Sequence, residues 1–519
     1  MTPNLFSFRG GVEPDTHKAE SSEVPIRHVP LPSRLVVPLI QSSQESARTI
    51  VTVGDKVLKG QCIGEAEGTG TAIHAPTSGT VTEIGCYPMA HPSGLASQAI
   101  VIEPDGEDHW ITQEPLDPVT ASHEEVVLRI QASGIVGMGG AIFPSHLKVK
   151  NKIETLVING AECEPWMTCD DRLMREQAAT VVTGSTILAH LTGAQQILIG
   201  IEDNKPEAIA AMRAAVCDME PVARKCLDAD KITVVAVPTR YPSGGARQLV
   251  RILTGIEAPP GRRLTSFGVQ CFNVATAHAV CRALLHGESM VSRIVTVTGN
   301  VEHPGNYDVL LGMPIADLLA FCKVKPDTTR VLMGGPMMGF SLRSLDAPVT
   351  KACNCLIAAS NESFPPPPPE QPCIRCGECA NACPTGLQPF ELYWASRAKN
   401  FANTERHHLS NCMECGCCAY VCPAHIPLVD YFRFAKSEIR ARNEERKAAD
   451  QARARFESRR LRLEREKAEK AARLAAKAAE TRAKAAAGDS ALIAAAVETL
   501  KGEPPQSPAQ DNATPLHDQ

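Results

Sequence analysis

Short apolar runs alternate with polar positions along the first hundred residues. Between about residues 26 and 105 the runs are separated by Gly, Pro and Asp, as at Gly54-Asp55. Period-two alternation bounded by such residues predicts short β-strands, so we expect a small β domain here. Residues 1–25 are polar and without periodicity, and they are predicted to form an N-terminal arm.

A different pattern occupies residues 120–290. Apolar strand-like runs and helix-like segments follow one another at 123–132, 155–158, 172–191, 196–201, 206–217, 232–237 and 276–286. Strands that alternate with helices of this length form mostly parallel sheets. We therefore predict a Rossmann-like α/β domain.

Two smaller domains are predicted next. Residues 291–346 combine two strand patterns with a short helix and are predicted to form a β-grasp unit. A run of prolines at 365–369 is a stiff spacer, and it lies within a predicted α-helical domain at 347–434. An amphipathic stretch at 387–401 is expected to form helices in that domain.

Composition changes again in the last predicted segment, 435–519. From Arg433 to Lys484 there are 18 Lys and Arg against 9 Asp and Glu, although the whole chain carries a net charge of −5. Spaced pairs such as Glu480 and Lys484 support a long solvated helix ending near Gly488. A short helix at 490–500 and a disordered end should follow. Contact of the basic helix with acidic lipid or an acidic partner stays open.

Overall composition restricts the class of protein. With 519 residues and 44% hydrophobic content the chain should hold three or four packed domains. No apolar run reaches the roughly 18 residues that span a bilayer, and the first residues lack the apolar centre of a signal peptide. Of the 20 cysteines, the twelve outside the motifs described below form no paired framework, which indicates a reducing compartment. The globular part is acidic, so no nucleic-acid partner is expected.

Cysteines provide the strongest chemical signal. The pattern Cys-x-x-Cys-x-x-Cys-x-x-x-Cys-Pro occurs twice between Cys373 and Pro423. In two-cluster ferredoxins the fourth cysteine of each run binds the other [4Fe-4S] cluster. Zinc ribbons and disulfides are alternatives, but neither requires this spacing followed by proline. The predicted ligand sets are Cys373, Cys376, Cys379 and Cys422 for one cluster, and Cys412, Cys415, Cys418 and Cys383 for the other.

Glycine-rich turns in the α/β domain predict a ligand pocket. Residues 134–148 hold glycines dense enough for backbone amides to approach phosphate or flavin oxygens. A polar cluster at 159–165 follows the first strand, where open α/β sheets bind ligands. The turn at 239–249 is either a second wall of this pocket or an ordinary helix N-terminus. An iron-sulfur cluster passes one electron at a time, whereas a nicotinamide gives or takes two as a hydride. An enzyme that joins them needs a flavin to convert between the two.

Several other residues resemble functional residues by type, but the residues around them do not support a functional role. Gly68 stands where carrier domains of similar sequence bear a modified lysine, so a carrier function is disfavoured. His303 has no partner at metal-ligand spacing, and Cys353 with Cys355 cannot complete a four-ligand site. Cys417 lies off the ligand spacing and is predicted to be non-ligating.

The combined motifs carry a family resemblance. The segment Gly137-x-Gly139-Gly140-Ala141-x-Phe143-Pro144-x-x-Leu147-Lys148, followed by Asn159-x-x-Glu162-x-Glu164-Pro165, resembles the FMN and NADH site of the NADH-binding subunit of respiratory complex I. With the carrier-like β domain, the β-grasp (SLBB) unit and the double ferredoxin run in this order, residues 5–435 resemble the RnfC/RsxC family, a component of the Rnf/Rsx ion-translocating electron-transport complex.

That resemblance implies a function and a cellular place. It implies a peripheral subunit on the cytoplasmic face of the bacterial inner membrane, bound to the other Rnf/Rsx subunits. It implies an NADH/ferredoxin-type oxidoreductase that exchanges electrons between NAD(H) and a ferredoxin-type carrier through non-covalent FMN and the two clusters.

Site residues follow from the resemblance by position. Gly137, Gly139, Gly140 and Lys148 would line the flavin phosphate and nicotinamide pocket. Glu162 and Glu164, the candidate catalytic residues, would contact the flavin edge or nearby water together with Asn159. Tyr241 and Gly244 would form the other wall, and Asn273 and Thr276 the FMN phosphate side.

Four positions depart from the complex I pattern. An arginine is expected at Met138 and a glycine at Ile142, and acidic residues are expected at Gly245 and Ala246. These departures support an alternative hypothesis: a cluster-bearing relay and docking subunit without an active nucleotide site.

Overall fold

The computed structural model describes residues 4–43, 45–486 and 497. It divides into two units, residues 1–436 and 437–519. Among the described residues, no helix combines the length and apolar character needed to cross a membrane.

A four-stranded parallel sheet of order β11-β10-β9-β12 forms the centre of the α/β region. Its strands are β9 (Thr155–Gly160), β10 (Gln196–Glu202), β11 (Ile232–Val237) and β12 (Val269–Asn273). Its helices are α2 (His123–Ala132), α3 (Ser145–Lys148), α4 (Cys169–Glu176), α5 (Ala178–Thr192), α6 (Pro206–Cys217), α7 (Pro221–Cys226), α8 (Ala246–Thr254) and α9 (Val274–Leu285). The predicted parallel α/β domain is confirmed, except that one predicted helix is divided at Gln177 into α4 and α5.

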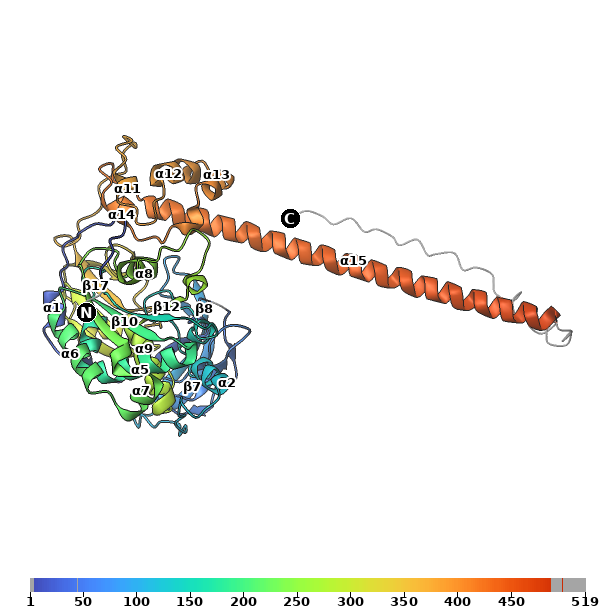
Figure 1. Cartoon of the computed structure of the whole chain (residues 1–519), viewed down its shortest axis with the longest axis horizontal. Helices are drawn as coiled ribbons and strands as arrows, with labels where there is room; N and C mark the ends of the chain where they lie inside the picture. Colours follow the sequence, from blue (N-terminus) through green and yellow to red (C-terminus); the bar gives the residue numbers. More distant parts are fainter. Residues whose placement is uncertain (1–3, 44, 487–496, 498–519) are drawn as a thin grey trace. The chain divides into compact units, whose positions relative to one another are not determined.

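Apolar side chains of these strands alternate between two cores. Ile158 and Ile199 pack with α5, α6 and α9, whereas Val157 and Leu198 pack with α8 on the other face. Figure 1 shows α5 and α9 on one side of β10 and α8 on the other. Because both faces are covered, the strands read as nearly continuous apolar runs.

The N-terminal β region holds two small antiparallel sheets, β2-β8-β7-β4 and β3-β5-β6. Its strands are β2 (Leu35–Pro38), β3 (Arg48–Thr49), β4 (Lys56–Val57), β5 (Cys62–Glu65), β6 (Ile73–His74), β7 (Gly79–Pro88) and β8 (Ala96–Pro104). Their apolar side chains share one core with the β-grasp region, as Val37 and Val297 illustrate.

The β-grasp sheet draws strands from outside the predicted range of 291–346. Its order is β1-β14-β13-β17-β15-β16. These strands are β1 (Arg27–His28), β13 (Ser292–Gly299), β14 (Gly305–Leu310), β15 (Thr328–Met333), β16 (Phe340–Ser341) and β17 (Cys355–Ser360), with helix α10 (Ile315–Phe321). All six residues of β17 are buried. A strand that is apolar at nearly every position is stable only when both faces are covered, and β17 gains this cover in the present sheet rather than in the following region.

The cysteine-rich region is helical. It contains α11 (Glu378–Asn381), α12 (Pro389–Arg397), α13 (Phe401–Arg406), α14 (Cys417–Tyr420) and the start of α15 (Leu428–Ala486). The predicted helices near 387–401 are therefore confirmed. Helix α15 begins before the predicted boundary at residue 435, because Leu428 and Phe432 are buried against the cysteine-rich region.

In the second unit, every side chain from 441 to 484 is exposed. Lys484 and Glu480 form the expected pair, with 3.0 Å between Nζ and Oε1. The predicted helix at 490–500 and the disordered end lie outside the described residues, apart from Val497.

The N-terminal arm packs against the globular part. Its short helix α1 (Ala19–Ser22) follows Lys18, and β1, just after the arm, pairs in parallel with β14. Val12 and Tyr241 exchange two backbone hydrogen bonds of 2.8 and 2.9 Å. The arm therefore connects the α/β and β-grasp regions.

Candidate functional site

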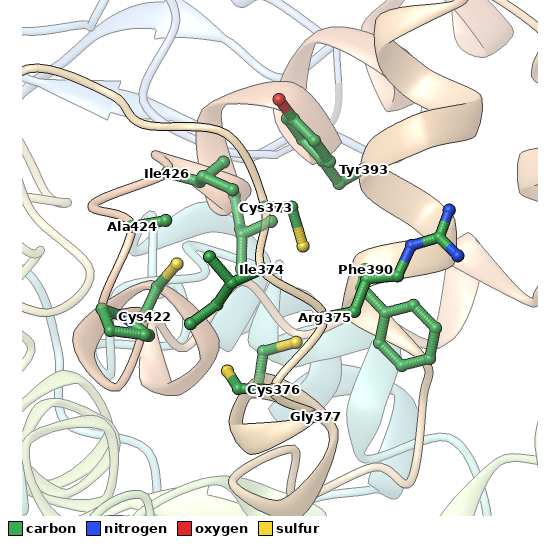
Figure 2. A pocket seen from close by; sticks show the side chains of 13 residues that line it. Cys373, Ile374, Arg375, Cys376, Gly377, Phe390, Tyr393, Cys422, Ala424 and Ile426 are labelled. Atoms are coloured by element: carbon green, nitrogen blue, oxygen red, sulfur yellow. The ribbon is translucent and has the colours of Figure 1, made fainter.

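Four cysteines surround the first of two cavities in the cysteine-rich region. Figure 2 shows Cys373, Cys376 and Cys422 with their sulfur atoms turned toward a shared space. Cys379 lines the same cavity, and Phe390, Ile426 and Leu428 cover it. Four thiols in an apolar enclosure fit the requirements of a [4Fe-4S] cluster. These are the four cysteines that the spacing assigns to one cluster.

The second cavity holds the other predicted set. Cys383, Cys412, Cys415 and Cys418 line it, with Leu392, Val429 and Phe432 as apolar cover. Helices α12 and α15 contribute to both cavities, so they exclude water from both sites. Exclusion of water helps to set a cluster's reduction potential. Cys417 is buried but does not line this cavity.

Charged side chains fix the loop that carries Cys412 and Cys415. The Lys436 ammonium donates to the Cys412 carbonyl oxygen at 2.6 Å and to Glu414 at 2.7 Å. Arg433 donates to the same carboxylate at 3.1 Å. Burial opposes the charge, but the bonds from Lys436 and Arg433 hold the pKa of Glu414 below its usual value. The first turns of α15 thus stabilise this ligand loop.

The first glycine turn is closed by backbone bonds and by Thr276. Gly137 N donates to Phe143 O at 2.8 Å, and Met138 N donates to Thr276 Oγ1 at 2.9 Å. Gly140 has φ +98°, and a Cβ added there would meet nothing within 4 Å. The turn therefore leaves open space beside Gly140, where a ligand could approach the backbone.

Asn273 caps helix α9 beside this turn. Its Oδ1 accepts from Ala275 N at 2.8 Å, and its Nδ2 donates to Asp170 Oδ2 at 2.6 Å. A Cβ added to Gly139 would lie 3.6 Å from the Asn273 side chain, so the glycine leaves a cradle at the helix N-terminus. Helix N-termini bind phosphate through amides that lack partners. Here Asn273 already accepts the Ala275 amide, and the open space lies beside Gly139 and Gly140.

Lys148 lies at the edge of the same region. Its ammonium donates to the Cys271 carbonyl and lies 4.1 Å from the centroid of the Phe272 ring. Burial lowers the pKa of Lys148. The cation is therefore held by local contacts near the end of β12, within the sheet that bears Asn273.

The two candidate catalytic glutamates both accept backbone hydrogen bonds. Glu162 accepts from Asp170 N at 2.9 Å and Asp171 N at 3.3 Å, at the start of α4. Glu164 accepts from Met337 N and Met338 N at 2.8 and 3.0 Å, and burial raises its pKa. Each carboxylate therefore fixes a loop, and neither is positioned as a free general base.

Lys18 organises this acidic loop and was not identified from the sequence. Its ammonium donates to the carbonyl oxygens of Glu162 at 2.7 Å and Glu164 at 2.9 Å, and also to that of Met167. Burial lowers the pKa of Lys18. The arm around it carries no periodic pattern, so the sequence held no signal that could have placed it here.

The second glycine turn forms a wall against the acidic loop. Asn159 Nδ2 donates to Gly244 O at 2.8 Å, which joins the end of β9 to this turn. A Cβ at Gly244 would lie 2.2 Å from Ala161 O, so only glycine fits there. Tyr241 is buried, and its hydroxyl donates to Cys415 O at 2.6 Å. The turn therefore connects the acidic loop with the second cysteine site.

The four positions that depart from the complex I pattern lie in different surroundings. Met138 is buried with Met290 and Leu311 in a core shared with the β-grasp region. Ile142 keeps a left-handed conformation, φ +41°, where the complex I motif has glycine; a β-branched residue is strained there. A Cβ at Gly245 would approach Met413 Cε to 2.7 Å. Ala246 begins α8.

Asp170 was also missed by the sequence. It lies between Asn273 and Glu162, and burial, followed by the charge of Glu162, raises its pKa to about 7. Glu162, Cys169 and Asp170 are the group of potential metal ligands that the described residues bring together. The sequence did hold one signal for Asp170: an acidic pair begins the helix that follows the predicted pocket strand.

The remaining candidates take structural positions. Cys353 and Cys355 are both buried in the protein core, and Cys355 begins β17. Within the described ranges neither joins a cluster of three potential metal ligands. His303 accepts a hydrogen bond from the Tyr307 hydroxyl through its backbone carbonyl oxygen, at 2.6 Å.

Family models match four segments of the chain. They are the RnfC barrel sandwich hybrid domain at 6–107, the Nuo51 FMN-binding domain at 130–282, the SLBB domain at 294–341 and the 4Fe-4S dicluster domain at 372–426. The predicted fold class is confirmed. FMN and two [4Fe-4S] clusters are the cofactors that these domains support.

Two chains of an NAD+-reducing [NiFe]-hydrogenase show a partial structural likeness. The H2-reduced form matches with a TM-score of 0.45 and 18% identity, covering 58% of this chain and 60% of that one. The air-oxidised form matches with a TM-score of 0.44 and 18% identity, covering 63% and 69%.

A curated relative matches much more closely in sequence. The C subunit of the ion-translocating oxidoreductase complex of Pasteurella multocida (strain Pm70) is 45% identical over 452 residues, which is 86% of this chain and 53% of the relative. The chain thus spans about half the length of that relative. The chain belongs to the RnfC family of ion-translocating oxidoreductase complex subunits.

Proposed function

We propose that the chain is a peripheral electron-transfer subunit of a membrane-bound ion-translocating complex. It exchanges electrons between NAD(H) and a ferredoxin-type carrier through FMN and two [4Fe-4S] clusters. The observation that carries the proposal is the 2.6 Å hydrogen bond from Tyr241 to Cys415, which joins an FMN-type domain directly to a cluster-ligand loop. This contact holds the second glycine turn of that domain against a ligand of one cluster site.

The proposed cofactor residues divide by role. Gly137, Gly139, Gly140 and Asn273 would receive the FMN phosphate at the N-terminus of α9. FMN, when bound, supplies the conversion between a two-electron hydride and single electrons. Thr276 fixes the glycine turn through Met138 N, and Lys148 adds a positive charge near the end of β12. The eight cysteines of the two cavities would be the cluster ligands.

The glutamates and the second turn would position these groups. Hydride transfer from a nicotinamide depends on geometry more than on a protein base. Glu162 and Glu164 hold the acidic loop, while Asn159, Tyr241 and Gly244 hold the opposite wall. We assign no general base among them.

The family suggests the place and partners of the chain. The name of the relative describes a subunit of an ion-translocating oxidoreductase complex. We propose that this chain binds other subunits of such a complex on the cytoplasmic face of the inner membrane. The domain limits we propose are those expected from the sequence, with β17 added to the β-grasp domain.

An anaerobic preparation tests the proposed function. The purified chain should release one FMN and contain about eight irons, as expected for two cubes. Addition of NADH should bleach the flavin and then the cluster absorbance. Absence of flavin together with absence of bleaching would refute the oxidoreductase.

The relay without an active nucleotide site is the second candidate. The observations behind it are the apolar surroundings of Met138 and the lack of room for a side chain at Gly245, where the complex I pattern has an arginine and an acidic residue. The two functions differ in one result. A relay would keep its clusters and accept electrons from dithionite, but NADH would not quench its flavin fluorescence or bleach its clusters.

A further inference from the structure

Lys351 is a buried lysine in the loop between β16 and β17. The residue is 1% exposed, and its ammonium donates to Gly134 O at 2.6 Å and to Ala72 O at 3.4 Å. Burial lowers the pKa of this ammonium to about 7, against the opposing effect of the Cys62 thiol. A buried charge is costly unless hydrogen bonds compensate it. The two carbonyl oxygens therefore supply the compensation that holds a cation at this position.

These contacts join three regions of the chain. Ala72 immediately precedes β6 of the N-terminal β region, Gly134 opens the first glycine turn, and Lys351 belongs to the β-grasp region. The backbone of Lys351 is itself fixed, because its amide donates to Gln41 Oε1 at 3.3 Å and its carbonyl oxygen accepts from the buried Arg293 guanidinium. The ammonium therefore acts from a fixed backbone on the start of the turn.

The contact requires the glycine at position 134. The φ of Gly134 is +72°, and a Cβ added there would lie 2.6 Å from Ala72 O and 2.8 Å from Lys351 Nζ. A larger residue would displace the carbonyl or the ammonium. The next residue, Ile135, accepts from Ser145 N at 3.1 Å, so the two ends of the turn are joined directly after Gly134. A shift of Gly134 therefore moves the glycine segment as a whole.

Among the described residues around this junction, Lys351 is the group that changes its charge near neutral pH. Burial lowers the pKa of His74 to about 3, so its ring is neutral, and burial raises the pKa of the Cys62 thiol. A guanidinium such as that of Arg293 keeps its proton at ordinary pH. The strength of the bond to Gly134 O should therefore follow the protonation of Lys351.

We propose that the Lys351 ammonium is a positioning residue for the flavin, a role that rests on the proposed function. It holds Gly134 O, and through this bond the packing of the β-grasp and N-terminal β regions fixes the turn that would receive the FMN phosphate. Flavin affinity is then a property of three regions together. A charge-assisted hydrogen bond is stronger than a neutral one, so the turn is held best while the lysine is protonated.

Replacement of the cation tests this role in the full chain, purified anaerobically and titrated with FMN. Lys351→Met keeps a stem of similar length but leaves Gly134 O and Ala72 O without their donor, so FMN should bind about tenfold more weakly. Flavin fluorescence measures the dissociation constant. Unchanged affinity in Lys351→Met would overturn the inference.

Val349→Ala is the matched control. Val349 lies in the same loop and is buried in the core that the β-grasp region shares. Its truncation should lower the melting temperature but leave the affinity for FMN unchanged. An equal loss of affinity in both variants would show that Lys351 acts only through the stability of its domain.

The pH profile distinguishes positioning by a charge from a merely structural role. Wild-type affinity for FMN should fall as pH rises from about 6 to 8, because the ammonium loses its proton at about pH 7. Asp170, whose pKa is raised to about 7, and the FMN phosphate titrate in wild type and variant alike. The difference between the two curves therefore reports Lys351, and Lys351→Met should give the shallower curve. Parallel curves would contradict the inference.

Hydrogen exchange separates failure of the inference from failure of the proposed function, because it needs no flavin. In Lys351→Met the amides of residues 134–145 should exchange faster, whereas those of α5 should keep their wild-type rates. A wild-type chain that binds no FMN would refute the flavin site, while faster exchange in the variant would still support the role of Lys351 in holding the turn.

The wild type alone supplies a measurement if the variant does not fold. Protection of residues 134–145, corrected for the intrinsic exchange rate, should fall between about pH 6 and pH 8, and protection of α5 should not. Protection of the turn that stays constant over this range would overturn the role of Lys351.

Discussion

The hydroxyl of Tyr241 donates a hydrogen bond of 2.6 Å to the backbone carbonyl oxygen of Cys415, a residue 174 positions further along the chain. The bond is buried. It joins a turn of the FMN-type domain to a cluster-ligand loop. Loss of the bond should therefore change properties of the cluster site that can be measured.

Removal of this hydroxyl should weaken the ligand loop that carries Cys412 and Cys415. Tyr241→Phe leaves the Cys415 carbonyl buried without its donor, at a cost of about 1–3 kcal/mol. Iron should therefore pass to a chelator faster than from the wild type. Tyr431→Phe is the control, since its hydroxyl bonds to exposed Glu370; equal rates for both variants would contradict the expectation.

Two glycines should separate a binding role from a folding role. Gly139→Ala adds a Cβ at 3.6 Å from Asn273, an ordinary contact, so the fold should persist while FMN content falls. Gly244→Ala places a Cβ 2.2 Å from Ala161 O and should lower thermal stability with or without flavin. Flavin release and melting temperature measure the two effects. Undiminished flavin in Gly139→Ala would refute the phosphate cradle.

Asp170 should make stability depend on pH. Its pKa is raised from 3.8 to about 7, chiefly by burial. Between these values the folded chain holds a proton that the unfolded chain has lost, so stability falls as pH rises from about 4 to 7. Asp170→Asn removes this penalty while it retains a polar side chain beside Asn273.

Melting temperatures at pH 5 and pH 8 test this expectation. Asp170→Asn should gain stability over the wild type at pH 8 and gain less at pH 5. Asp228→Asn, at an exposed position, is the control. A gain that is the same at both pH values would show that the carboxylate charge is not the cause.

Lys18 should be essential for the acidic loop. Lys18→Met keeps the aliphatic stem but leaves the buried carbonyls of Glu162, Glu164 and Met167 without their donor. A loss of about 3 kcal/mol or more is expected from such orphaned groups, together with a loss of flavin. Chemical unfolding and flavin release measure both, and Lys152→Met at the surface is the control. Wild-type flavin content in Lys18→Met would contradict this role.

The end of the globular unit can be located by two truncations. Ending the chain after Lys436 keeps the ammonium that bonds to Cys412 O and Glu414, and iron should stay near eight per chain. Ending it after Phe434 removes that cation, and iron content should fall. Equal iron in both products would show that Lys436 does not stabilise the ligand loop.

Local patterns predicted much of the fold. Helices α2 and α6 and strand β11 lie at the predicted residues, because periodicity and capping are encoded within each segment. At α2, for example, Ser122 and Glu125 form a capping box. The position of β17 could not be predicted in this way, since a buried strand carries no local sign of which sheet it joins.

The sequence by itself determined the two sets of cysteines that line the two cavities, and the two glycine turns of the α/β domain. Cysteine spacing acts over a few residues, and the glycine motifs act within single turns, so both can be read from the chain. Only the tertiary structure decided that Lys18 holds the acidic loop, that Glu162 and Glu164 accept backbone bonds, and that Tyr241 reaches Cys415 rather than the exposed site of Cys376. These contacts join segments far apart in the sequence, and their geometry depends on how whole domains pack.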